Sequence, residues 1–175
     1  MVEPPVMSAE EAAAALGRME SSIKGKSARM NELLGLTSSQ RACVAAEDAE
    51  GLLALVEQKG RAMAEIDGMD LEFLGCFQSL KGYLGVSSLE GMTAEALEAK
   101  GLDAAVMRGV KAHVASTANA IKELQAMDSE LREGSETLLG RLRAEVKKSN
   151  QKNQVRKAYT QYGGATGAQI LDRRG

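Results

Sequence analysis

Hydrophobic residues recur every three or four positions through residues 52–84, in the middle of the chain. The ten positions on this repeat are Leu52, Val56, Lys59, Met63, Ile66, Asp70, Phe73, Phe77, Leu80 and Leu84, and eight of them are apolar. A step that averages about 3.5 residues is typical of a helix packed lengthwise on another helix, whereas strands repeat every two residues. The pattern therefore predicts one amphipathic helix of roughly 35 residues, about 50 Å long.

A further amphipathic helix is predicted before it, beginning after Ser8, which has the chemistry of an N-cap and is followed by acidic residues. The apolar residues on its heptad repeat are Leu16, Met19, Ile23, Met30, Leu33 and Val44, and Lys26, Thr37 and Gln40 are polar residues on the same repeat. Glu47 and Asp48 mark a cap or kink between the two helices. Because no Pro-Gly turn separates them, residues 8–84 fit either one broken rod or two antiparallel helices.

The repeat fails over residues 85–93, which are rich in Gly and Ser, and a short helix is predicted from Thr93 until Gly101 ends it. A second long helix is predicted over residues 103–150. Its stripe consists of Val110, Val114, Thr117, Ile121, Leu124, Asp128, Leu131, Ser135, Leu138, Leu142 and Val146. The predicted fold class is therefore all-α, an elongated antiparallel helical bundle or hairpin of long amphipathic helices with coiled-coil-like packing.

Charge divides the chain into two parts. Residues 1–146 contain 15 Lys or Arg and 23 Asp or Glu, a net charge of −8, whereas residues 147–175 contain seven Lys or Arg and one Asp, a net charge of +6. Such a shift is typical of a separate functional segment. We expect a helical bundle domain over residues 1–146 and a basic C-terminal tail over residues 147–175, which becomes ordered on meeting an acidic or apolar partner.

The residues needed for catalysis do not assemble into a site in the sequence. His113 is the only histidine, and Cys43 and Cys76 have neither pair nor metal-ligand spacing. Gly25-Lys26-Ser27 lacks the earlier glycine of a phosphate-binding loop, and no strand precedes it. We therefore expect that this protein is not an enzyme and that it binds no cofactor or metal.

The sequence also argues against membrane insertion and nucleic-acid binding. No apolar run approaches about 18 residues, and residues 2–7 are too short for the apolar core of a signal peptide, so a cytoplasmic protein is expected. The basic tail has only Tyr159 and Tyr162 for base stacking, and the body is acidic. A protein partner for the tail is the better interpretation.

The tail carries a resemblance to a known family. Ser149-Asn150-Gln151-Lys152-Asn153 is followed by Tyr162-Gly163-Gly164-Ala165-Thr166-Gly167 and Leu171-Asp172-Arg173-Arg174. This order resembles the carboxyl end of the FlgN family of flagellar export chaperones, which commonly have a paired-Asn segment, a Tyr-Gly element and a closing basic element. Residues 36–70 are also similar to the family's amino-terminal pattern.

The resemblance implies a cytosolic chaperone of type III export. Such proteins bind the hook–filament junction proteins FlgK and FlgL and deliver them to the export gate protein FlhA. The tyrosine of the family's Tyr-Gly element contacts the gate, which implies gate binding at Tyr162 and Gly163. In the family an apolar helical stretch often separates the paired-Asn and Tyr-Gly elements, but here only residues 154–161 lie between them.

Cargo binding is therefore expected on the upstream helix, at Leu131, Leu138, Leu142 and Val146. An exposed apolar strip there would accept an amphipathic cargo helix. The alternative is that these residues only seal the intramolecular bundle. Two other functions also remain open: a FliT-type chaperone of the filament cap protein, and a structural coiled-coil homodimer.

Overall fold

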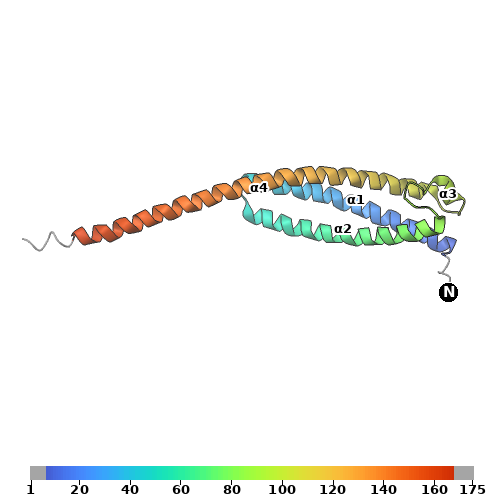
Figure 1. Cartoon of the computed structure of the whole chain (residues 1–175), viewed down its shortest axis with the longest axis horizontal. Helices are drawn as coiled ribbons and strands as arrows, with labels where there is room; N and C mark the ends of the chain where they lie inside the picture. The colour runs from blue at the N-terminus through green and yellow to red at the C-terminus, as the bar shows by residue number, and fades with distance from the viewer. Residues whose placement is uncertain (1–6, 168–175) are drawn as a thin grey trace, which may run out of the picture. The chain divides into compact units, whose positions relative to one another are not determined.

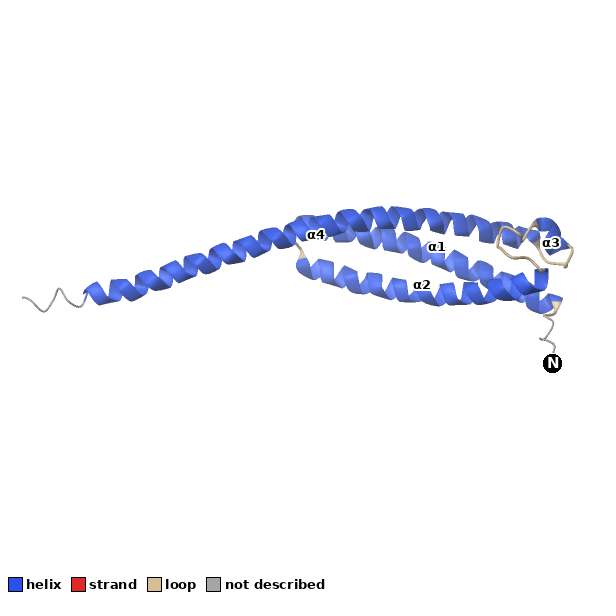
Figure 2. Ribbon diagram, viewed as in Figure 1, coloured by secondary structure: helices blue, strands red, loops and turns tan. Residues whose placement is uncertain are grey.

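The computed structural model describes the backbone of residues 7–167 and the side chains of residues 7–160. The helices are α1 (Ala9–Ala46), α2 (Ala49–Leu84), α3 (Ala94–Glu98) and α4 (Ala104–Gly167), and the described residues contain no strand (Figure 2). The prediction of an all-α fold is confirmed. The chain divides into two compact units, Met1–Leu131 and Arg132–Gly175, so that α4 belongs to both.

In the first unit, α1 and α2 form an antiparallel hairpin (Figure 1). Along their contact, successively later residues of α1 meet successively earlier residues of α2. The pairs are Ser22 with Glu72 at 2.7 Å, Lys26 with Asp70 at 2.6 Å, and Arg29 with Glu65 at 2.6 Å. The structure thus resolves the alternatives for residues 8–84 in favour of two helices.

The helix ends are capped largely as the sequence predicts. Ser8 Oγ accepts a hydrogen bond from the Glu11 backbone N–H, and the Glu11 carboxylate accepts one from the Ser8 N–H, which lowers the pKa of Glu11. Between α1 and α2, Glu47 adopts the left-handed conformation with φ 59°, and Asp48 accepts a hydrogen bond from the Gly51 N–H at 2.9 Å. Two residues therefore reverse the chain without Pro-Gly.

The first part of α4 completes a three-helix bundle in this unit (Figure 1). It runs parallel to α1, since Glu20 lies against Gly109 and Arg41 pairs with Glu130. It runs antiparallel to α2, as the sequence predicts, and Lys59 pairs across these two helices with Asp128.

The larger apolar core lies at the end of the bundle where the loop and α3 connect α2 to α4. Gly85 and Gly101 have positive φ angles and end the helices that precede them, and Thr93 caps α3. The buried residues of this core are Ala12, Ala15, Leu16, Met19, Ile23, Cys76, Leu80, Met92, Leu97, Leu102, Met107 and Val110. Side chains from all four helices and the connecting loop therefore stabilise this end.

Toward the α1–α2 turn the core becomes smaller and more polar. Its buried apolar residues are Met30, Leu33, Ala62, Ile66 and Ala120. Thr37, Gln40 and Thr117 are also buried, and each has a side-chain oxygen without a hydrogen-bond partner among the described residues. An unsatisfied buried polar atom costs about 1–3 kcal/mol, so this half of the bundle is the less stable one.

The predicted stripe of α2 is only partly buried. Ile66 and Leu80 are in the core, but Val56 and Met63 are 50% and 52% exposed, and Ala62 and Cys76 are buried instead. An α-helix has about 3.6 residues per turn, so a seven-residue repeat drifts around its surface by about 20° per heptad. For this reason the residues of α2 that pack on its neighbours are not the same as the residues of the predicted stripe along the whole helix.

Helix α4 extends farther than the sequence pattern predicts. It continues to Gly167 rather than ending near Asn150, because no proline or capping residue interrupts it. The predicted domain boundary between residues 146 and 147 rests on charge and stays a prediction, whereas the compact units divide between Leu131 and Arg132.

Truncating Leu80 should destabilise the protein far more than truncating Leu71. Leu80 is fully buried and Leu71 is 73% exposed on the same helix. We expect Leu80→Ala to lower the free energy of unfolding by about 2–5 kcal/mol, and Leu71→Ala to change it by no more than about 0.5 kcal/mol. Urea unfolding followed by circular dichroism measures both values. Equal losses would contradict the assigned core.

Replacing Gln40 by methionine should stabilise the bundle. Gln40 is 3% exposed, and its Oε1 accepts no hydrogen bond from the described residues. Gln40→Met removes a buried acceptor at nearly constant volume and should raise the free energy of unfolding by about 1 kcal/mol. The control is Gln58→Met, at an exposed position of α2, which should have little effect. A clear loss of stability in Gln40→Met would show that the amide is satisfied.

Candidate functional site

The second unit presents an apolar strip on α4. Leu139, Leu142 and Val146 are 51%, 42% and 61% exposed, and they follow one another at steps of three and four residues. Such steps place side chains on one face of a helix. We call these three residues the α4 strip. Leu138, next to it in sequence, is half-buried.

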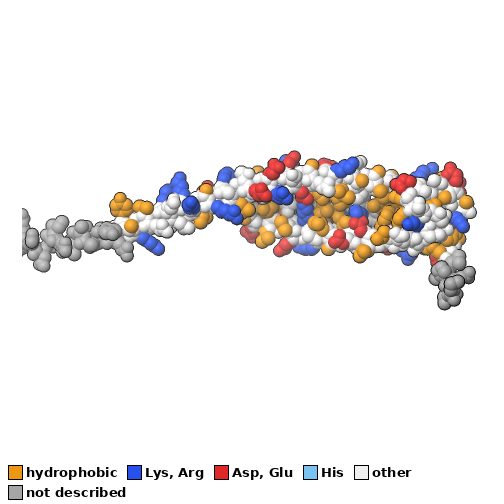
Figure 3. All heavy atoms as spheres, viewed as in Figure 1, with side chains coloured by type: hydrophobic (Ala, Val, Ile, Leu, Met, Phe, Trp, Pro, Cys, Tyr) orange, Lys and Arg blue, Asp and Glu red, His pale blue; other side chains and the backbone are white. Residues whose placement is uncertain are grey.

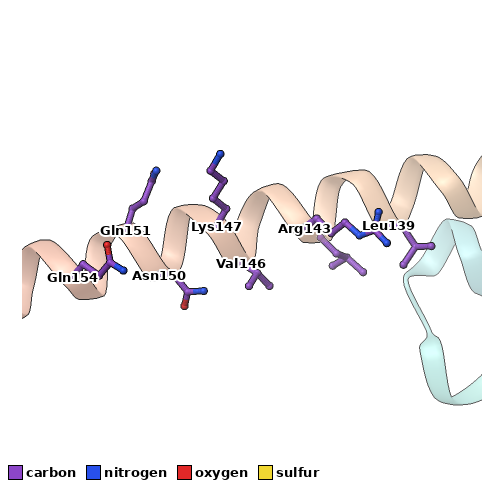
Figure 4. Close-up of a pocket in the computed structure, with 8 residues that line it drawn as sticks. Leu139, Arg143, Val146, Lys147, Asn150, Gln151 and Gln154 are labelled. Carbon is purple, nitrogen blue, oxygen red and sulfur yellow. The ribbon is translucent and has the colours of Figure 1, made fainter.

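Polar side chains continue the same surface beyond the strip. The shallow hollow there is lined by Leu139, Leu142, Arg143, Val146, Lys147, Asn150, Gln151 and Gln154. Figure 4 shows Leu139, Val146 and Asn150 on one side of the helix, while Lys147 and Gln151 extend from the other side. A partner helix on this face would meet leucine and valine side chains first and amide groups one to two turns farther along.

The surface around the strip is strongly cationic. Between residues 141 and 157 the only acidic residue is Glu145. The basic residues in this segment are Arg141, Arg143, Lys147, Lys148, Lys152, Arg156 and Lys157. All have exposed side chains. Because their charges have the same sign, they favour a partner whose apolar face is flanked by carboxylates.

The sequence-predicted cargo residues lie in both units. Leu131 is half-buried and ends the first unit, whereas Leu138, Leu142 and Val146 are in the second. Sequence reasoning missed Leu139, although it lies three residues before Leu142 and seven before Val146. That spacing was the available signal. The predicted stripe includes Leu138 instead, because it extends the repeat of Leu124 and Leu131 by seven residues.

The predicted gate residues are described only in part. Tyr162 and Gly163 lie in the helical backbone of α4, but their side-chain environment is outside the described residues. The closing basic element, residues 171–174, is also outside the described residues. Tyr159, three residues before Tyr162, is 77% exposed.

Metal binding and membrane insertion find no support among the described residues. Over the described residues no group of three or more His, Cys, Asp or Glu is arranged to hold a metal ion. None of the helices in this part of the chain has an apolar stretch that would reach across a bilayer. The α4 strip is therefore the candidate that the described residues support best.

A three-helix bundle together with an exposed, cation-flanked helix face defines an all-helical protein with an apolar surface that its own described residues leave uncovered. The protein-family comparison makes the class specific. The model described as FlgN protein matches residues 15–167, so the chain belongs to the FlgN family, a family of flagellar export chaperones. No match was found among curated proteins or among solved structures.

Proposed function

We propose that this protein is a cytoplasmic chaperone that binds hook–filament junction proteins of the FlgK and FlgL type and delivers them to the export gate protein FlhA. Membership of the FlgN family supports the general role. The observation that carries the cargo site is the exposed α4 strip with its cationic surroundings. Cargo binding and delivery are chaperone functions, so the proposal requires no catalysis.

The strip suits an amphipathic cargo helix that is unfolded before assembly. A partner helix that covers Leu139, Leu142 and Val146 removes apolar area from water at about 25 cal/mol per Å². Ordering the cargo opposes this gain, so the complex is expected to be reversible. Reversibility is what delivery requires, because the cargo must leave the chaperone at the gate.

The proposal divides the two tasks between two segments of α4. Cargo would contact Leu131, Leu138, Leu142 and Val146 together with Leu139. The gate protein would contact the later Tyr162 and Gly163. The aromatic ring of Tyr162 would supply an apolar surface with a polar tip, a combination that is common at protein interfaces. Separate segments allow the gate to bind a chaperone that still carries its cargo.

Placing a charge on the strip should weaken cargo binding. Val146 and Val155 are 61% and 55% exposed, and they lie nine residues apart, which is two and a half turns and therefore opposite faces of α4. We expect Val146→Asp to reduce the affinity for the carboxyl-terminal segment of FlgK or FlgL by about tenfold or more. The control Val155→Asp should bind like the unmodified protein. Isothermal titration calorimetry measures both affinities.

The same titration tests the choice of cargo. Absence of binding to both junction-protein segments at tens of micromolar would overturn the proposal, and binding to the filament cap protein instead would indicate a FliT-type chaperone. Equal losses in Val146→Asp and Val155→Asp would show that the α4 strip is not the cargo surface.

Removing the Tyr162 ring should affect the gate and spare the cargo. We expect Tyr162→Ala to weaken binding to FlhA by about tenfold or more, with unchanged affinity for the cargo segment. Tyr159→Ala, at the exposed tyrosine one turn earlier, is the matched control and should retain gate binding. Pull-down with the soluble part of FlhA and calorimetry with cargo report the two activities. A loss of both would refute the division of tasks.

A further inference from the structure

Helix α4 has a second exposed surface on the side away from the α4 strip, and this surface is basic. Val155 and Tyr159, 55% and 77% exposed, lie one turn apart on it. Lys148, Lys152 and Arg156 follow one another at steps of four residues, and all three are exposed. Steps of three and four residues join these five side chains into one helix face, which we call the basic face. Figure 3 shows lysine and arginine side chains at the surface of this part of the chain.

The basic face differs in shape from the surface around the α4 strip. None of its five residues lines the shallow hollow beside the strip. Its side chains project from the convex surface of a single helix. Two of its three cations are lysines, which are point charges on flexible stems and bind anions without a fixed geometry. Such a face suits a partner whose negative charge is spread over an area rather than concentrated at one site.

Val155 and Tyr159 favour a lipid surface over a purely ionic partner. Tyrosine has an apolar ring and a polar hydroxyl group, and it is enriched at the headgroup level of membranes. Lysine and arginine beside such residues can lay their apolar stems along the interface and keep their charged ends among the headgroups. Helices that lie on anionic bilayers combine the same two kinds of residue.

The distribution of charge along the chain would orient it on such a surface. Residues 1–146 are net negative, whereas residues 147–175 are net positive. An anionic bilayer therefore attracts the later part of α4 and repels the bundle. This asymmetry favours contact through α4 alone.

We propose that the basic face of α4 binds reversibly to an anionic lipid bilayer, with the helix parallel to the surface. Lys148, Lys152 and Arg156 would contact lipid phosphates, and Val155 and Tyr159 would enter the headgroup region. The binding is adsorption and not insertion, in keeping with the absence of a bilayer-spanning apolar stretch from the described helices.

Lipid binding would leave the α4 strip available. Val155 of the basic face and Val146 of the strip lie on opposite sides of α4, nine residues apart. A chain adsorbed through the basic face would therefore present the strip away from the lipid. Lipid binding does not depend on the proposed cargo or gate, so its test is independent of theirs.

Sedimentation of the full chain with vesicles tests the lipid partner. We expect binding to vesicles of phosphatidylcholine with about one third phosphatidylglycerol, and none to phosphatidylcholine alone. Raising the salt from about 0.05 to about 0.5 M should release the protein, because the range of electrostatic attraction shortens. Equal binding to both vesicles, or none to the anionic ones at low salt, would overturn the proposal. Binding to soluble poly-glutamate but not to anionic vesicles would indicate an acidic protein partner and would also overturn it.

Removing charge from the basic face should weaken lipid binding specifically. We expect Lys148→Gln combined with Lys152→Gln to lower partitioning onto anionic vesicles about tenfold or more, since each cation near such a surface contributes about fivefold. The control combines Lys24→Gln with Lys122→Gln, at exposed positions of the first unit, and removes the same net charge. It should change partitioning less than about twofold. Equal losses would show that net charge and not the basic face determines binding.

A matched pair of valine variants identifies the side of α4 that meets the lipid. We expect Val155→Asp to lower partitioning about tenfold or more, and Val146→Asp to lower it no more than about threefold. Both valines are exposed, and circular dichroism should show both variants folded. A larger loss in Val146→Asp than in Val155→Asp would place the lipid on the α4 strip and overturn the proposal.

Discussion

Covering of apolar stripes on long helices is the interaction on which the rest of the structure depends. A helix of the length of α1 or α2 gains little from hydrogen bonding alone, and it is stabilised mainly by packing its apolar face on other helices. In the first unit each of the three long helices covers part of the other two. Where no neighbour covers apolar residues, on the outside of α2 and on α4 beyond Arg132, they stay in contact with water. The α4 strip, the candidate functional site, is one of these places.

Polar contacts within the bundle set which residues face one another. Burial of apolar area is not directional, and helices rich in alanine and leucine can slide by a turn with little change in buried area. Lys26 with Asp70 and Lys59 with Asp128 each join specific turns of two helices, and both lysines are mostly buried. The half-exposed aspartates limit what these pairs add to stability. Lys59 with Asp128 lies in the less apolar half of the bundle, and Lys26 with Asp70 lies between the two cores, where apolar packing specifies the pairing of turns least.

Most of the fold could be predicted from the sequence because its signals are local. Ser8, Asp48 and Thr93 cap helices as expected, and Gly101 ends the short helix. The exposure of Val56 and Met63 could not be predicted in this way, because it depends on how far a 3.6-residue helix drifts from a 3.5-residue repeat over its contact with a neighbour. On α4, Leu139 is more exposed than Leu138, the residue on the predicted stripe. The antiparallel path of α1 and α2 required the left-handed Glu47, which the sequence does not signal.

Charge distinguishes the α4 strip from the exposed apolar residues of α2. The α4 strip lies among lysine and arginine side chains, so a second copy of the same strip would add like charges, whereas a carboxylate-flanked helix would neutralise them. By contrast, the exposed apolar residues of α2 are interspersed with glycines at which an added Cβ would meet no atom within 4 Å. The charges around the α4 strip are therefore consistent with the proposed site for a carboxylate-flanked cargo helix.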